Sequence, residues 1–223
     1  MKHAIVAPIV LLTAFLSVGQ ITQVPTAVAQ TTGPDRLRWD WERQEELSWH
    51  LSISRRKNLQ PSERKRLIEV IVDQIRDVAS EDHGVSSDEQ LAHIAAETRI
   101  KYIDLNGDGK PEVIAQAGAE ETGCSPTGNC PFWIFRCRGT SYEVLLEGEA
   151  QTFTIQHTRT KGYSDIVLSR HASAFESEAR EYKFDGNFYR ESACFDVEWS
   201  ALGSDGEFHE LKKPRINPCG TSR

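Results

Sequence analysis

Residues 99–191 alternate between short apolar segments and glycine-containing turns, a pattern that constrains the fold more than any other feature of this chain. The segments are rich in Val, Ile, Tyr and Phe, which favour β-strands. Short turns between two such segments predict antiparallel hairpins. We therefore expect antiparallel β-structure throughout this region. The predicted strand pairs are residues 99–105 with 112–117, 132–138 with 142–146, 152–158 with 164–169, and 179–184 with 188–191.

The predicted strands also repeat along the chain. Residues 109–115, Gly-Lys-Pro-Glu-Val-Ile-Ala, correspond to residues 162–168, Gly-Tyr-Ser-Asp-Ile-Val-Leu, at an offset of 53. Residues 135–142 correspond to residues 182–189 at an offset of 47. A period of roughly 50 residues with four strands per copy is typical of propeller blades. Two copies cannot close a ring, so we expect a curved antiparallel sheet or a partial barrel.

A predicted helical region precedes the strands. Pro61 suits the first position of a helix, where its missing N–H would have no partner, and apolar residues then recur every three or four positions as far as residue 79. A second helix is expected to start near Ser86, because Ser86 and Glu89 match a capping box. We expect an α+β fold in which these N-terminal helices pack on the antiparallel β-sheet.

The beginning of the chain has the pattern of a signal peptide. Basic Lys2 and His3 precede a mostly apolar stretch, residues 4–18, and Ala27-Val28-Ala29 offers a cleavage site. That stretch is shorter than the ~20 residues of a membrane-spanning helix, so we expect no transmembrane segment after cleavage. The mature protein is predicted to be periplasmic or secreted. The predicted divisions are a signal peptide (1–29), a mainly helical segment (30–98), a β domain of two hairpin repeats (99–192) and a C-terminal tail (193–223).

The charge of the chain argues against a nucleic-acid partner. Its formal net charge is −7, whereas binding to nucleic acid depends on Lys and Arg that neutralise phosphates. The basic run at residues 55–57, Arg-Arg-Lys, is interpreted as a solvated loop.

All five cysteines follow the predicted cleavage site. Export favours disulfides, although sequence alone does not fix their connectivity. Cys124 and Cys130 bracket a turn-rich loop and are the favoured pair, and Cys194 with Cys219 would hold the C-terminal tail. The fifth, Cys137, is expected to stay free and to lie on an apolar strand face. A zinc site is disfavoured because the paired spacing of zinc ligands is missing.

The turn at residues 104–112, Asp-Leu-Asn-Gly-Asp-Gly-Lys-Pro-Glu, carries the clearest chemistry. Calcium prefers several oxygen ligands, which a sharp turn can bring together. Side-chain oxygens fall at positions 1, 3, 5 and 9 of this turn, and a glycine at position 6 permits the reversal. The alternative is a metal-free hairpin, because Asn-Gly and Asp-Gly are favoured turn dipeptides. The candidate calcium ligands are Asp104, Asn106, Asp108, the carbonyl of Lys110, and Glu112.

The turn begins like an EF-hand loop, but Ala115 occupies position 12 and the flanking segments are predicted strands. It resembles instead the calcium turn of FG-GAP and VCBS-type repeats, where Asp-x-Asn-x-Asp-Gly-x-x-(Asp/Glu) links two strands of a blade. The resemblance implies that these positions bind calcium. The second copy, residues 159–165, has lost nearly all of the ligands, and no Phe-Gly or Gly-Ala-Pro signature precedes the turn. We therefore expect at most one calcium ion, bound weakly at roughly 10⁻⁴–10⁻³ M and with a structural role.

Two loops are expected to emerge at the same end of the sheet, residues 118–131 and 171–178. Loops on a rigid scaffold commonly carry binding sites. The first hypothesis is therefore a calcium-binding module with a protein or glycan partner, and the alternative is a hydrolase, or an inhibitor of one, with its site in these loops. No nucleophile elbow, HExxH motif or phosphate-binding loop is present, and no catalytic residue is predicted. The polar residues of these loops are Glu120, Glu121, His171, Ser173, Glu176 and Glu178.

Overall fold

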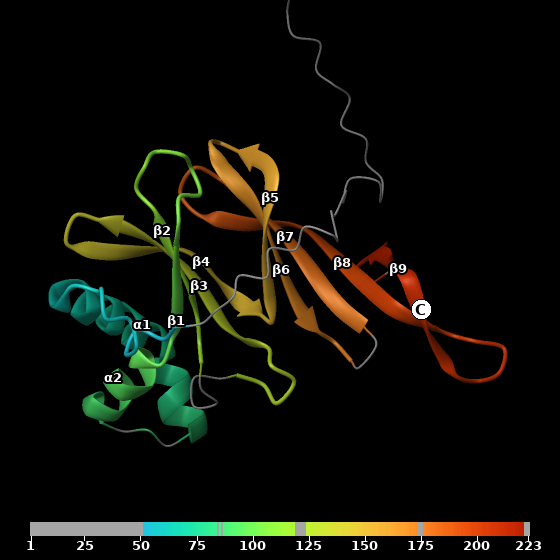
Figure 1. The fold of residues 1–223 in the computed structure, drawn as a ribbon, viewed down its shortest axis with the longest axis horizontal. Coiled ribbons are helices and arrows are strands. Elements are labelled where there is room, and N and C mark those ends of the chain that lie inside the picture. Colours follow the sequence, from blue (N-terminus) through green and yellow to red (C-terminus); the bar gives the residue numbers. More distant parts are fainter. Residues whose placement is uncertain (1–50, 84, 86, 119–123, 174–175, 221–223) are drawn as a thin grey trace, which may run out of the picture. The chain divides into compact units, whose positions relative to one another are not determined.

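The computed structural model describes residues 51–220, apart from 84, 86, 119–123 and 174–175. The predicted signal peptide and its cleavage site lie outside these residues. Within the described part, two helices precede nine strands that form two antiparallel sheets (Figure 1). The predicted α+β architecture, with helices on antiparallel β-structure, is confirmed.

The two helices are α1 (Pro61–His83) and α2 (Asp88–Ala96). The predicted start of the first is confirmed, and it runs four residues past the predicted end at residue 79. The cap of the second differs by one position. Ser87, and not Ser86, precedes α2, and its hydroxyl accepts the amide of Gln90 at 3.1 Å. Neither described helix is long and apolar enough to cross a membrane.

Both sheets are meanders in which each strand pairs antiparallel with the next along the chain. The second sheet curls along its length (Figure 1). The strands of the first sheet are β1 (Arg99–Ile103), β2 (Glu112–Gln116), β3 (Cys130–Arg138) and β4 (Ser141–Ala150). Those of the second are β5 (Thr152–Thr160), β6 (Tyr163–His171), β7 (Glu176–Phe184), β8 (Tyr189–Leu202) and β9 (Phe208–Pro218).

The two sheets repeat each other in register. Ile100 lies opposite Ala115 in the first sheet, and Phe153 lies opposite Leu168, each residue 53 positions later, in the second. The β3–β4 ladder is interrupted after Ile134, and the β7–β8 ladder is interrupted 47 positions later. The internal repeat predicted from the sequence therefore extends to the pairing of individual residues.

The first sheet is the middle of three layers. Its Val113 side faces the helices, and its Ile114 side faces the second sheet, so β2 is buried at all five positions. Across the second interface, the rings of Phe132 and Phe153 stack with centroids 5.0 Å apart. The core against the helices includes Ile53, Leu67, Ile71, Ile75, Leu91, Ile100, Val113, Ala115, Trp133 and Phe135. The core between the sheets includes Ile114, Phe132, Ile134, Leu146, Phe153, Tyr163, Ile166, Leu168, Phe184 and Tyr189.

Like faces of the two sheets point the same way. Ile100, Val113 and Ala115 of the first sheet pack against the helices. Their counterparts 53 positions later, Phe153, Ile166 and Leu168, pack against the first sheet. The helices therefore cover the same face of the first sheet that the first sheet covers on the second sheet.

The predicted boundary at residue 192 is wrong, because β8 runs through it and β9 follows. The region assigned to a tail mostly forms the β8–β9 pair of the second sheet. Val197 of β8 is buried, and Ile216 of β9 packs against its cluster. The disulfide Cys194–Cys219 links β8 to the residue that follows β9. Most other residues of β9 are exposed, which conceals the two-residue period in the sequence.

Candidate functional site

The carboxylate of Asp104 organises the turn between β1 and β2. Its Oδ1 accepts the amides of Gly107 at 2.7 Å and Asp108 at 3.2 Å, and its Oδ2 accepts the amide of Gly109 at 2.8 Å. Both glycines have a positive φ, 77° and 81°, which L-residues rarely adopt. Hydrogen bonds from these amides, most of all from Gly109, lower the pKa of Asp104. The turn is thus closed by a carboxylate that stays ionised.

The next two polar side chains also accept hydrogen bonds from the turn. Asn106 Oδ1 accepts the amide of Asp108 at 2.8 Å, and Asp108 Oδ1 accepts the amide of Lys110 at 2.7 Å. Asn106 Nδ2 donates to Asp108 Oδ2 at 3.1 Å. Asp108 and Lys110 are exposed at the tip, so their remaining oxygen lone pairs face solvent.

Glu112, at the start of β2, is 2 % exposed. Its Oε2 accepts the amide of Leu105 at 2.9 Å, and its Oε1 accepts the hydroxyl of Tyr163 at 3.4 Å. Burial raises the pKa of Glu112, and the negative charges of Asp108 and Asp104 raise it further, against the lowering effect of the Leu105 amide. A carboxylate in this position gains from a nearby cation.

The acidic turn is seated on the second sheet. The hydroxyl of Tyr163 accepts Asn106 Nδ2 at 2.9 Å and Arg136 Nη1 at 3.3 Å. Arg159, before the β5–β6 turn, donates to the carbonyl of Asn106 at 3.1 Å. The turn is therefore part of the joint between the two repeats, and a change in its conformation would be felt by both sheets.

The second repeat carries basic residues at the corresponding positions. This agrees with the predicted loss of ligands from the second copy. It leaves the first turn as the acidic member of the pair. The residues 53 positions after Asp104, Asn106 and Asp108 are His157, Arg159 and Lys161.

All the predicted calcium ligands lie in this one turn, but their carboxylates do not converge on a point. Among the described residues, the one group of three Asp, Glu, His or Cys ligand atoms within 4.8 Å of one another is Glu178 with Cys194 and Cys219. Those two sulfurs form a disulfide and are not available as thiolates. The candidate ligand atoms of the turn are all oxygens, the ligand type that calcium prefers. Hydrogen bonds from backbone amides hold them in place.

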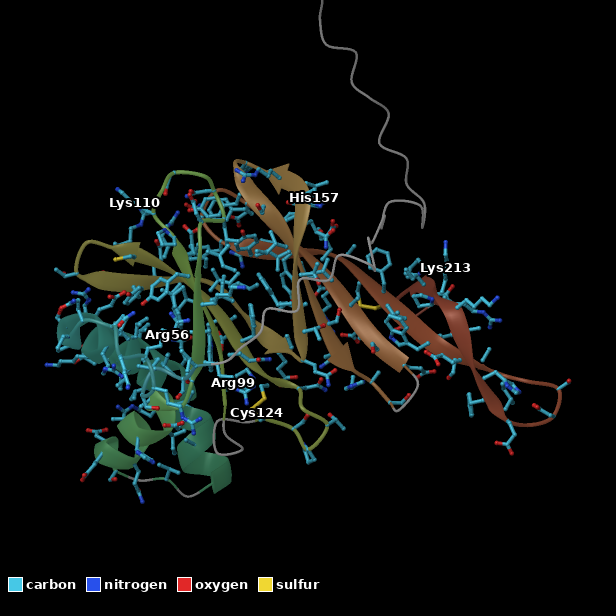
Figure 2. The ribbon with its side chains drawn as sticks, in the orientation of Figure 1. Arg56, Arg99, Lys110, Cys124, His157 and Lys213 are labelled. Carbon is cyan, nitrogen blue, oxygen red and sulfur yellow. A yellow bond between two sulfur atoms is a disulfide. The ribbon has the colours of Figure 1, made fainter. Side chains whose placement is uncertain are left out.

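The two predicted binding loops lie at the same end of the sheets, as expected. The side chain of Asn129 accepts the amide of His171 at 2.9 Å and donates to its carbonyl at 2.9 Å. Figure 2 shows Cys124, in the first of these loops, and Lys110, in the acidic turn, at opposite ends of the first sheet. Glu120 and Glu121 fall outside the described residues.

The residues with triad chemistry in these loops do not form a triad. Ser173 donates to Glu176 at 3.5 Å, while the hydrogen bonds of His171 within the described residues are those of its backbone to Asn129. Glu178 lies between Arg170 at 2.9 Å and Arg180 at 2.5 Å. Burial opposes ionisation of Glu178, but the two guanidinium groups outweigh it and lower the pKa.

Both predicted disulfides, Cys124–Cys130 and Cys194–Cys219, are present. Cys137 is the free cysteine of the described region, as predicted. Its expected place on an apolar strand face is wrong, because Cys137 is exposed at the end of β3. Trp133 and Phe135, which share its side of the strand, lie under the helices, whereas Cys137 lies beyond the part that the helical cluster covers.

A groove beside α1 was not predicted from the sequence. Two adjoining cavities, of about 860 and 560 Å³, share Lys57, Asn58 and Leu59 as lining residues. The basic run at 55–57, which the sequence suggests is a solvated loop, lines these cavities. What could have identified the groove is its position directly before Pro61, where basic and apolar residues lead into a helix.

Comparison with protein-family models, with curated proteins and with solved structures finds no match to this chain.

Proposed function

We propose that this chain is an exported β-repeat module whose turn at residues 104–112 binds one calcium ion. The observation that carries the proposal is the position of Glu112. Its carboxylate is buried beside those of Asp104 and Asp108, and its partners among the described residues are the amide of Leu105 and the hydroxyl of Tyr163. A divalent cation would relieve the repulsion among these three carboxylates. Asp104, Asn106, Asp108 and the Lys110 carbonyl would supply the remaining oxygen ligands.

The ion would act as a structural staple. The turn lacks a bidentate acid at position 12, so the affinity belongs in the weak range of extracellular modules, about 10⁻⁴–10⁻³ M. Because Asn106 and Glu112 both contact Tyr163 of the second repeat, calcium would stabilise the joint between the sheets as well as the turn.

The working surface would then be the opposite end of the sheets. There two hydrogen bonds between the side chain of Asn129 and the backbone of His171, the Asn129 clamp, hold the loops at 118–131 and 171–178 together. We propose a protein or glycan as the partner. Two disulfides in the described region are consistent with an oxidising compartment, and the place of action would be the periplasm or the cell exterior. A hydrolase is the weaker alternative, because His171 and Ser173 are not joined by a hydrogen bond.

Calcium is expected to raise the melting temperature of the mature chain. At 10 mM calcium, a dissociation constant of about 10⁻⁴–10⁻³ M corresponds to about 1.4–2.7 kcal/mol of stabilisation, or a rise of about 3–10 °C for a chain of this size. Scanning calorimetry in calcium and in chelator measures it. Asp108→Ala should abolish the rise.

Asp185→Ala is the matched control. Asp185 also closes a turn through two amides, those of Asn187 at 2.8 Å and Phe188 at 2.9 Å, but it lies outside the acidic turn. This variant should be less stable than the native chain and should still respond to calcium. A melting temperature of the native chain that is the same in calcium and in chelator would remove the proposal.

The stability contributed by Glu112 is expected to fall as the pH rises, which is the opposite of the usual behaviour of a carboxylate. Its pKa is raised in the folded state, so the folded chain holds this proton more tightly than the unfolded chain, and stability falls as the pH rises through that range. In chelator, the melting temperature of Glu112→Gln relative to the native chain should therefore increase as the pH rises above the ordinary pKa of a glutamate. Calcium should reverse this difference at pH 7. A difference that does not change with pH would contradict the prediction.

A further inference from the structure

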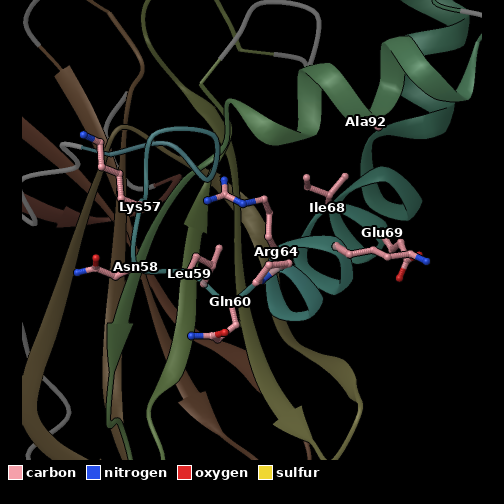
Figure 3. A pocket seen from close by; sticks show the side chains of 10 residues that line it. Lys57, Asn58, Leu59, Gln60, Arg64, Ile68, Glu69 and Ala92 are labelled. Carbon is pink, nitrogen blue, oxygen red and sulfur yellow. The ribbon is translucent and has the colours of Figure 1, made fainter.

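Apolar residues form part of the lining of the groove beside α1. The groove lies between the loop that ends at residue 60, the first turns of α1 and Ala92 of α2, and Figure 3 shows Arg64 between Leu59 and Ile68. Its larger cavity, about 860 Å³, falls in the range of ligand-binding pockets, about 300–1,000 Å³. The apolar residues that line the larger cavity are Leu59, Pro61, Ile68 and Ala92.

The groove is basic, although the chain as a whole has a net charge of −7. Five cationic and two acidic side chains line its two cavities. One of the acids, Glu63, is engaged by the hydroxyl of Tyr102 at 2.7 Å. The other, Glu69, lies 3.7 Å from Lys65. The cationic residues are Arg55, Arg56, Lys57, Arg64 and Lys65.

The two arginines nearest the core are held by neutral acceptors. Arg64 donates to the carbonyls of Ile53 and Arg56, and Arg56 donates to the carbonyl of Ile100 at 2.5 Å. Carbonyl oxygens satisfy the guanidinium geometry without cancelling its charge. The Nε of Arg56 is buried and has no hydrogen-bond partner among the described residues. Cationic side chains therefore outnumber acidic ones in the groove, which favours an anionic ligand such as a carboxylate.

We propose that this groove binds an acidic peptide segment of a partner protein. Apolar side chains of the segment pack on Leu59 and Ile68, and its carboxylates lie beside Arg55, Arg56 and Lys57. The surface is separate from the acidic turn, so the assignment stands whether or not that turn binds calcium. An acidic partner would be attracted by the local field of the groove and repelled by most of the remaining surface, which favours this one site.

A fluorescein-labelled hexapeptide of alternating leucine and glutamate is a suitable probe. Fluorescence polarisation with the intact mature chain should show binding that weakens at high salt, because the rim charges are exposed to screening. Arg55→Glu combined with Lys57→Glu should weaken binding by about tenfold or more. Both residues are exposed, so the double variant keeps the native fold, and its melting temperature is the check.

Lys212→Glu combined with Lys213→Glu provides the matched control, since it makes the same change of charge on exposed residues of β9. It should leave the affinity unchanged. Equal losses in the two double variants, equal binding of a leucine–lysine peptide, or the absence of binding would overturn the proposal. So would tighter binding after Glu45→Gln with Glu46→Gln, because the acidic stretch of this same chain would then be the occupant.

Discussion

Replacing Phe132 by alanine is expected to lower the free energy of unfolding by about 3–5 kcal/mol. Phe132 has no exposed surface, and its ring stacks on Phe153 of the second sheet. Truncation would leave a cavity at the interface of the two sheets, where neighbouring strands are fixed by their ladders and relax little. Urea denaturation followed by tryptophan fluorescence measures the loss, and a single transition is expected because both sheets share this core.

Phe188→Ala is the control for that measurement. Phe188 is 39 % exposed, in the turn between β7 and β8, and its contact with Arg190 is a surface cation–π pair with the guanidinium 5.5 Å from the ring centroid. Its loss should cost less than about 1 kcal/mol. Similar costs for the two variants, or two separate transitions in the native chain, would contradict the layered architecture.

Removal of the Cys194–Cys219 disulfide should cost more than removal of Cys124–Cys130. The two bonds close loops with sequence separations of 25 and 6 residues. The chain-entropy estimate gives about 3–4 kcal/mol for the longer loop and about 2 kcal/mol for the shorter. Paired Cys→Ser variants, each compared with a Cys137→Ser parent to prevent thiol exchange, would be measured by urea denaturation.

The order of the two effects is the informative result. The longer loop contains the turn and most of both strands of the β8–β9 hairpin, so opening it frees more of the unfolded chain. If the short loop proved the more costly, its role in holding the Asn129 clamp would outweigh loop entropy. The chain-entropy prediction would then be wrong.

The sequence predicts the strand pairing well because the turns carry strong local signals. Gly109 and Gly162 both adopt a positive φ in turns 53 residues apart, and glycine is the residue best suited to such a conformation. With the turns fixed, the alternation of apolar residues sets the register of each ladder. The same local signals placed every candidate calcium ligand in one turn.

The features that sequence reasoning missed depend on residues far apart in the chain. Glu112 is buried where it contacts Tyr163, 51 positions away, and nothing in the acidic motif itself indicates that burial. The groove requires the loop before Pro61 to meet Tyr102 of β1. The β9 strand was missed because its side chains are mostly exposed and it contains Lys212, Lys213 and Pro214, which are typical of a sheet edge.

The stacking of like faces has a consequence for assembly. A sheet whose front matches the back of its neighbour forms a heterologous interface, and such an interface either closes into a ring or continues indefinitely. Two sheets are too few to close a ring. The helices, packed over Ile100 and Val113 of the first sheet, cover the face on which a second molecule would otherwise add. Their detachment would expose the apolar side chains of this face.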